Sequence, residues 1–116
     1  MKDYMLLFIG ADYGTMGLSP EEMQERMGRW MGWAKKMSEA GVMKSGEALH
    51  ADGIKRISGN AQAVTDVAAA ELKELIGGFY IVKAKNADGA IKIAADFPDY
   101  DLGGTVEVRE VMVFDR

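Results

Sequence analysis

Two segments of this chain are apolar on both faces of an extended strand, and this pattern constrains the fold more than any other feature. Residues 4–9 read Tyr-Met-Leu-Leu-Phe-Ile, and residues 79–84 read Phe-Tyr-Ile-Val-Lys-Ala. Successive side chains of a strand point to opposite faces of its sheet. A sheet built on these two strands must therefore be covered on both faces.

A well-defined helix start follows the first of these strands. Ser19 is placed to cap a helix that begins at Pro20, and Glu22 completes a capping box. Gly41 lies where a left-handed cap ends a helix, so the helix is predicted over residues 20–39. A stripe of apolar residues at spacings of three and four predicts that one side of this helix faces a core. The stripe comprises Met23, Met27, Trp30, Ala34 and Met37.

The other elements are shorter. Four further strands are predicted over residues 42–49, 54–57, 61–65 and 105–114. The middle two form a hairpin around a Ser-Gly-Asn turn. Residues 67–76 are compatible with a helical turn or with a loop. A second helix is predicted to begin with Asn86 or Asp88 as its cap and to run through Phe97, because Pro98 stops it.

This order of elements predicts an α+β fold for a single domain over residues 1–116. Two strand–helix–strand halves fold most economically into a ferredoxin-like antiparallel sheet with both helices on one face. The other face is then left apolar, and a second copy of the chain is the simplest cover. The alternative is that the hairpin and residues 67–76 fold back over it as a lid. We expect a homodimer that associates through the sheet face.

Composition excludes several classes of protein. The net charge of −4 argues against a nucleic-acid partner. The chain has no cysteine, which excludes disulfides and thiolate metal sites, and no apolar run is long enough to cross a membrane. No phosphate-binding glycine loop is present, and His50 is the single histidine. We therefore expect a cytoplasmic protein without a metal or a cofactor.

Several stretches carry a family resemblance. They are Tyr4-Met5-Leu6-Leu7, Leu18-Ser19-Pro20-Glu21-Glu22-Met23, Ala40-Gly41-Val42 and the ending Gly104 with Val106-Glu107-Val108-Arg109. These stretches resemble the YCII-related (YciI-like) proteins, in particular the DGPF subgroup. The subgroup's motif is close to Asp-Gly-Pro-Phe-Ala-Glu-Thr-Lys-Glu, followed by Gly-Gly and an aromatic strand. The residues that match it are Asp66, Ala70, Glu71, Lys73, Glu74, Gly77 and Gly78, followed by Phe79-Tyr80.

This chain departs from the motif at its turn. Val-Ala-Ala at residues 67–69 replaces Gly-Pro-Phe, and Leu72 replaces Thr. The resemblance implies a dimeric α+β barrel, in which two ferredoxin-like sheets pack face to face. It does not imply an activity, because the wider fold includes cofactor-free monooxygenases, isomerases and haem enzymes. A His-Asp pair has been suggested as a catalytic site in some members.

Two residues are candidate acid/base groups. His50 follows the second strand beside Glu47 and Asp52 and could titrate near neutral pH, although a loop histidine can equally be solvated. Asp66 occupies the first position of the matched motif. It could serve as a pocket carboxylate or as the N-cap of a helix in residues 67–76.

Three further residues are candidate ligand contacts. Glu71 and Lys73 match the motif and could present a polar pair to a ligand, or form an ordinary solvated pair. Tyr80 belongs to the aromatic strand that follows. Two functions stay open: a small acid/base enzyme that acts on a small organic molecule without a cofactor, and a non-catalytic module for small-molecule binding or regulation. The enzyme predicts a partly apolar cavity that contains a carboxylate, whereas the module predicts that Asp66, Glu71 and Lys73 are exposed.

Overall fold

A computed structural model describes residues 1–10 and 12–114. Its main sheet has four antiparallel strands in the order β2-β5-β1-β6. These are β1 (Lys2–Ile9), β2 (Met43–Ala48), β5 (Ile76–Ala84) and β6 (Thr105–Glu110). The helices α1 (Pro20–Glu39) and α2 (Ala87–Ala94) follow β1 and β5 in the chain. The predicted α+β, ferredoxin-like fold is confirmed.

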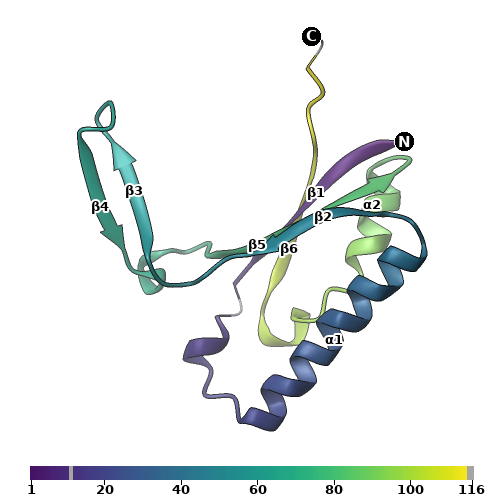
Figure 1. The fold of residues 1–116 in the computed structure, drawn as a ribbon, viewed down its shortest axis with the longest axis horizontal. Helices are drawn as coiled ribbons and strands as arrows, with labels where there is room; N and C mark the ends of the chain where they lie inside the picture. The colour runs from purple at the N-terminus through teal and green to yellow at the C-terminus, as the bar shows by residue number, and fades with distance from the viewer. Residues whose placement is uncertain (11, 115–116) are drawn as a thin grey trace.

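Strands β3 (Ile54–Ser58) and β4 (Ala63–Val67) form a separate two-stranded sheet. This hairpin stands away from the main sheet, as Figure 1 shows on its left-hand side. The turn between its strands places Asn60 and Ala61 at positive φ angles of 57° and 67°. The hairpin was predicted at this place, but the structure extends its second strand to Val67.

Local hydrogen bonds define α1 at the predicted residues. The Ser19 hydroxyl accepts from the backbone N–H of Glu22, and the Glu22 carboxylate accepts from the backbone N–H of Ser19, both at 3.1 Å. This capping box satisfies two N–H groups that a helix start leaves unpaired. At the other end, Gly41 has a φ of 70°, which is the expected left-handed conformation.

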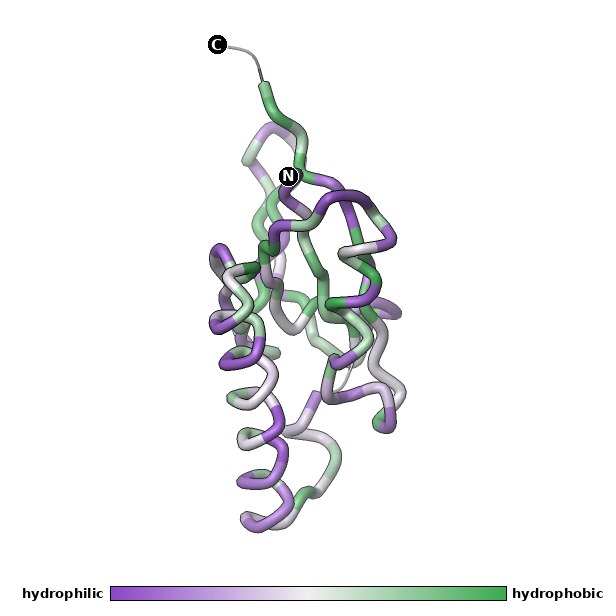
Figure 2. The backbone as a smooth tube through the Cα atoms, turned by 90° about the vertical axis from the view of Figure 1, so that its right-hand side faces the viewer, coloured by the Kyte–Doolittle hydropathy of each residue, from purple (hydrophilic) through white to green (hydrophobic). Residues whose placement is uncertain are grey.

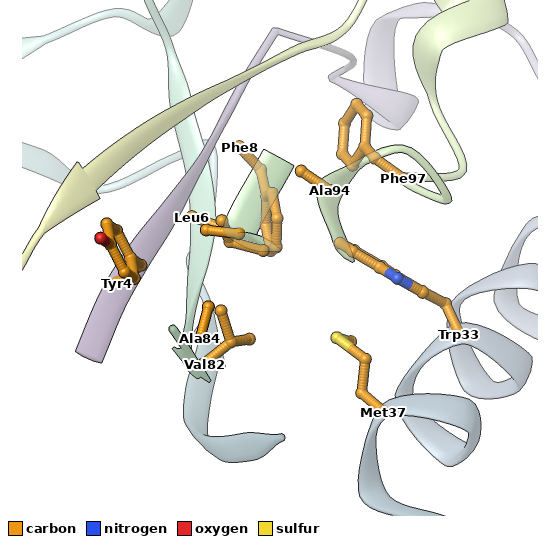
Figure 3. Packing of buried hydrophobic residues seen from close by; sticks show 10 residues of the cluster. Tyr4, Leu6, Phe8, Trp33, Met37, Val82, Ala84, Ala94 and Phe97 are labelled. Carbon is orange, nitrogen blue, oxygen red and sulfur yellow. The ribbon is translucent and has the colours of Figure 1, made fainter. Parts of the chain in front are cut away.

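Both helices cover the same face of the sheet. The side chains of Tyr4, Leu6 and Phe8 are buried on this face, and they form one cluster with side chains from both helices. Figure 3 shows Trp33 and Met37 of α1 pointing into this cluster. From α2 come Ala90 and Ala94. The alternate residues of β1, which point to the other face, are only partly buried.

Several element boundaries differ from the sequence prediction. The last strand ends at Glu110, because its partner β1 pairs Tyr4 with Glu110 and nears its own start there. The second helix ends at Ala94 rather than at Phe97. Residues 67–76 contain one short helical turn, Ala69–Glu71, before β5 begins at Ile76, in agreement with the helical turn or loop predicted there. The reading of Asp66 as a helix N-cap is wrong, since Asp66 lies within β4.

The apolar stripe of α1 is only partly core. Met37, in the second half of the helix, is buried, and so is Trp33, which lies beside the stripe. Met27, in the first half, is 41% exposed, and Trp30 is partly buried at the edge of the cluster. The first half of α1 therefore leaves space between itself and the sheet.

Gly46 in β2 is required by the packing of this face. A Cβ atom at this position would lie 2.1 Å from Cδ1 of Tyr80 and 2.8 Å from the carbonyl oxygen of Phe79. The absence of a side chain thus lets the Tyr80 ring lie against β2. By contrast, a Cβ atom at Gly28, on the exposed side of α1, would have no neighbour within 4 Å.

We predict opposite effects for two glycine-to-alanine substitutions. Gly46→Ala should lower the free energy of unfolding by about 1–3 kcal/mol, because Tyr80 and the backbone of β5 must shift. Gly28→Ala should raise it by up to about 1 kcal/mol, because alanine has the higher helix propensity. Urea denaturation followed by circular dichroism measures both, and a Gly46→Ala variant as stable as the wild type would contradict the packing described here.

Candidate functional site

A pocket of about 510 Å³ lies where the first half of α1 stands off the sheet. Its walls come from β1, the loop that follows β1, α1, β2, β5 and the segment between α2 and β6. The lining residues are Phe8, Gly10, Tyr13, Met27, Trp30, Gly46, Glu47, Ala48, Leu49, Gly77, Gly78, Tyr80, Phe97 and Asp99. This volume falls in the range of pockets that hold small organic molecules.

Glycines keep one side of the pocket free of side chains. A Cβ atom at Gly78 would lie 2.7 Å from the carbonyl oxygen of Glu47 and 3.2 Å from Cα of Ala48. Gly78 therefore lets β5 approach the end of β2 closely. The loop after β1 joins this edge through a hydrogen bond from Gly10 N–H to the carbonyl oxygen of Leu75, at 2.8 Å. Backbone thus forms this part of the lining.

Aromatic rings form much of the remaining wall. Phe8 lies at the centre: its ring stacks on Phe97 at 5.4 Å between centroids and meets Trp30 and Tyr80 edge-on, each at 5.0 Å. Edge-to-face and stacked pairs at these distances are favourable beyond the area that they bury. Each ring is held by at least one other ring, so the wall is rigid.

One buried carboxylate, that of Asp99, interrupts the apolar lining. Asp99 is 3% exposed. The hydroxyl of Tyr13, in the 3₁₀ turn Tyr13–Thr15 after β1, lies 2.7 Å and 2.8 Å from the two carboxylate oxygens. The indole N–H of Trp30 donates to the oxygen of Tyr13 at 2.8 Å. A chain of hydrogen bonds therefore runs from α1 through the β1 loop to the segment after α2.

Arg26 of α1 contacts the segment after α2 that carries Asp99. Its guanidinium donates to both carboxylate oxygens of Asp101 at 2.7 Å and to the carbonyl oxygen of Pro98 at 3.1 Å. The Nη1 atom of Arg26 also lies 3.5 Å from an oxygen of Asp99. A buried carboxylate is tolerated only when a cation or hydrogen-bond donors surround it. Arg26 and Tyr13 together meet that requirement.

These contacts shift the pKa values of the partners. Burial, followed by the hydrogen bond to Asp99, raises the pKa of Tyr13 to about 12. The hydrogen bonds from Arg26 lower the pKa of Asp101 to about 2, and the same pairing raises the pKa of Arg26. Burial also raises the pKa of Tyr80. At neutral pH both tyrosines are protonated, while the Arg26–Asp101 pair is fully charged.

The structure does not bring the sequence-predicted site residues together. Tyr80 lines the pocket. The side chain of His50 is 96% exposed, and its Nδ1 atom lies 3.9 Å from an oxygen of Asp52. Asp66 projects from the hairpin with 83% of its side chain exposed and pairs with Lys55. Glu71 and Lys73 are exposed, and neither belongs to the pocket lining.

Sequence reasoning missed Tyr13, Arg26 and Asp99. Tyr13 lies in a glycine-bearing loop, and Asp99 follows the proline that ends a helical segment. Neither position belongs to a motif. The available signal was weak: a Tyr and an Asp lie next to element ends, and Arg26 lies inside α1, in parts of the chain that a ferredoxin-like fold brings together.

Among the described residues, no group of three or more His, Cys, Asp or Glu side chains could hold a metal ion. Within the same residues, no helix is long and apolar enough to span a membrane.

Comparison with known proteins gives one positive result. The family model described as the YCII-related domain matches residues 4–115. No curated protein matches the sequence.

We predict that Tyr13 makes folding stability depend on pH in the alkaline range. The unfolded chain releases the Tyr13 proton near pH 10, whereas the folded chain keeps it until about pH 12. The free energy of unfolding should therefore fall between these values. Tyr13→Phe should reduce this fall by up to about 1 kcal/mol, after allowance for the partial exposure of the ring.

Urea denaturation at pH 9, 10 and 11 measures this difference. Tyr80 and Tyr100, whose pKa values burial also raises, contribute equally to both proteins and cancel. Parallel pH profiles for the wild type and Tyr13→Phe would show that Tyr13 is not held as described.

Proposed function

Because the chain belongs to the YCII-related domain family, and because a fold does not fix an activity, we propose its function from the pocket. The protein binds a small, largely apolar organic molecule between α1 and the sheet. The observation that carries this proposal is a preformed cavity with rigid aromatic walls and a single buried carboxylate, Asp99. Ligand sites are typically concave and apolar, with a few polar groups that orient the ligand.

Quenching of tryptophan fluorescence tests this proposal. Trp30 lines the pocket, whereas Trp33 lies in the core and donates its indole N–H to the carbonyl oxygen of Ile93. A neutral nitroaromatic probe, 4-nitrobenzyl alcohol, should quench Trp30 saturably with a Kd on the order of 1 mM or tighter. The single-tryptophan variant Trp33→Phe should retain strong saturable quenching. Trp30→Phe should show weaker saturable quenching, because the remaining Trp33 lies behind residue 30, with 5.6 Å between the two ring centroids.

The matched control is Asp66→Asn, which changes one carboxylate on the distant hairpin and should leave the Kd unchanged. Linear, unsaturable quenching of the Trp33→Phe variant at all probe concentrations would contradict binding in this pocket. Far-ultraviolet circular dichroism confirms that each variant is folded before it is titrated.

A second candidate function is a cofactor-free acid/base enzyme that uses the same pocket. It is favoured by the position of Asp99, a carboxylate that could accept a proton from a bound substrate. Tyr80 also lines the pocket, and its hydroxyl could donate a hydrogen bond to the same substrate. A proton shift of this kind, as in an isomerase or a lyase, needs no further reactant.

We also propose that the protein is a homodimer in which the open face of the sheet packs against the same face of a second copy. The apolar residues at the centre of this face are Met5, Leu7, Ile9, Phe79 and Ile81. Figure 1 shows both helices on the same side of the main sheet. Nothing among the described residues forms a layer on the open side.

The exposed area supports the same proposal. The chain exposes 8280 Å², whereas a compact monomer of 12.7 kDa exposes about 6,200 Å². The excess of about 2,000 Å² exceeds what one partner contributes to a standard interface, about 800 Å². Part of it is the C-terminal segment after β6, where Val113 is 91% exposed. Figure 2 shows this apolar segment, coloured green, leaving the body of the molecule.

We predict that charge on the open face gives a monomer. The wild type should run at twice the 12.7-kDa chain mass at micromolar concentration in light scattering after size exclusion. Leu7→Glu and Ile81→Glu should each shift it to the single-chain mass, because a carboxylate cannot be buried unpaired in an apolar interface. Ile91→Glu, on the exposed side of α2, is the control and should stay dimeric. A folded wild-type particle of single-chain mass would refute the dimer.

A further inference from the structure

The hydrogen-bond donors next to Asp99, at the polar end of the pocket, already donate to acceptors of the protein. An indole N–H can only donate, so the Tyr13 oxygen accepts from Trp30. A phenol has one hydrogen, and the hydrogen of Tyr13 therefore points to Asp99. Because burial holds the pKa of Tyr13 near 12, this hydrogen stays in place at neutral pH.

Asp99 keeps acceptor capacity that the protein does not use. An ionised carboxylate offers about four acceptor positions, and Tyr13 supplies one hydrogen to them. The Nη1 atom of Arg26 lies 3.5 Å away, but its two hydrogens go to the carbonyl oxygen of Pro98 and to the Asp101 carboxylate. Among the described residues, no other side chain donates to the Asp99 carboxylate. Asp99 belongs to the pocket lining, and Tyr13 is the one described side chain that donates to its carboxylate.

The pocket lining carries negative charge only. Glu47 and Asp99 are its two carboxylates, and no Lys, Arg or His belongs to the lining. The nearest cation, Arg26, is bound through both of its terminal nitrogens to Asp101. Asp99 is therefore the more distant of the two carboxylates that Arg26 faces, at 3.5 Å against 2.7 Å for Asp101.

The aromatic rings that line the pocket also favour a ligand that carries positive charge. Phe8, Trp30, Tyr80 and Phe97 surround the space. The faces of aromatic rings carry partial negative charge and attract organic cations. Acceptors, carboxylates and ring faces therefore all favour a ligand that donates hydrogen bonds and carries positive charge.

We propose that this pocket selects a protonated amine attached to an aromatic or other apolar body. The ammonium group donates to the open acceptor positions of Asp99, and the apolar body packs against Phe8, Trp30 and Phe97. This inference rests on the proposed function, since it names the ligand class of the same pocket. It goes further in requiring that charge, and not apolar area alone, decides affinity.

Three probes that share one ring and differ in charge test the proposal. They are 2-naphthylmethylamine, 2-naphthylmethanol and 2-naphthoate, titrated by calorimetry at pH 7, where the amine is a cation and the acid an anion. The amine should bind at least tenfold more tightly than the alcohol and at least a hundredfold more tightly than the carboxylate. An alcohol or carboxylate that binds as tightly as the amine would overturn the cation preference while leaving the binding pocket intact.

Failure of the proposed function looks different: none of the three probes would bind, and the inference would be overturned with it. A substitution then tests whether Asp99 is the source of the preference for a cation. Asp99→Asn should bring the affinities of the amine and the alcohol within about threefold of each other, whereas Asp66→Asn, an equal change of charge on the hairpin, should keep the wild-type ratio. Preserved cation preference in a folded Asp99→Asn protein would overturn the role of Asp99.

Discussion

The buried carboxylate of Asp99 is the constraint on which this end of the molecule depends. A charge that is 3% exposed must be surrounded by partners, and these come from distant parts of the chain: Tyr13 after β1 and Arg26 on α1. Trp30 on α1 donates in turn to the Tyr13 oxygen. The contacts fix the β1 loop and the first half of α1 against the segment after α2. Since that half of α1 has little direct packing on the sheet, the polar contacts hold the helix where it leaves a cavity beneath it.

The same cavity depends on small residues in the sheet. Gly46 and Gly78 bring β2 and β5 closer than a Cβ atom would permit, and Tyr80 lies in the space at Gly46. The aromatic cluster around Phe8 then forms a rigid wall on the side of the core. Rigid walls lower the cost of ordering a site when a ligand binds. The sheet and the helices of this fold thus surround the pocket, and the side chains that line it determine which ligands it can bind.

The sequence predicted the features that local interactions determine. Ser19 and Glu22 hydrogen-bond to each other across three positions, and Pro20 fits the first helical position, so the start of α1 was predictable to the residue. The apolar residues on both faces of segment 4–9 likewise identified a central strand. The pocket was not predictable in this way, because Tyr13 and Asp99 lie 86 positions apart and meet only when the sheet has formed. His50 and Asp66 were chosen by residue type and motif position, but their exposure depends on the direction in which the hairpin leaves the sheet. No local pattern encodes that direction.

A crystal structure of the protein grown with 2-naphthylmethylamine tests the central claim most directly. The account predicts electron density for the naphthalene ring beside Phe8, Trp30 and Phe97, with the amine nitrogen within hydrogen-bond distance of an Asp99 oxygen. Tyr13 and Trp30 would keep the hydrogen bonds that they make without the ligand. A probe found on the open face of the sheet or against the hairpin, with the pocket left empty, would contradict it.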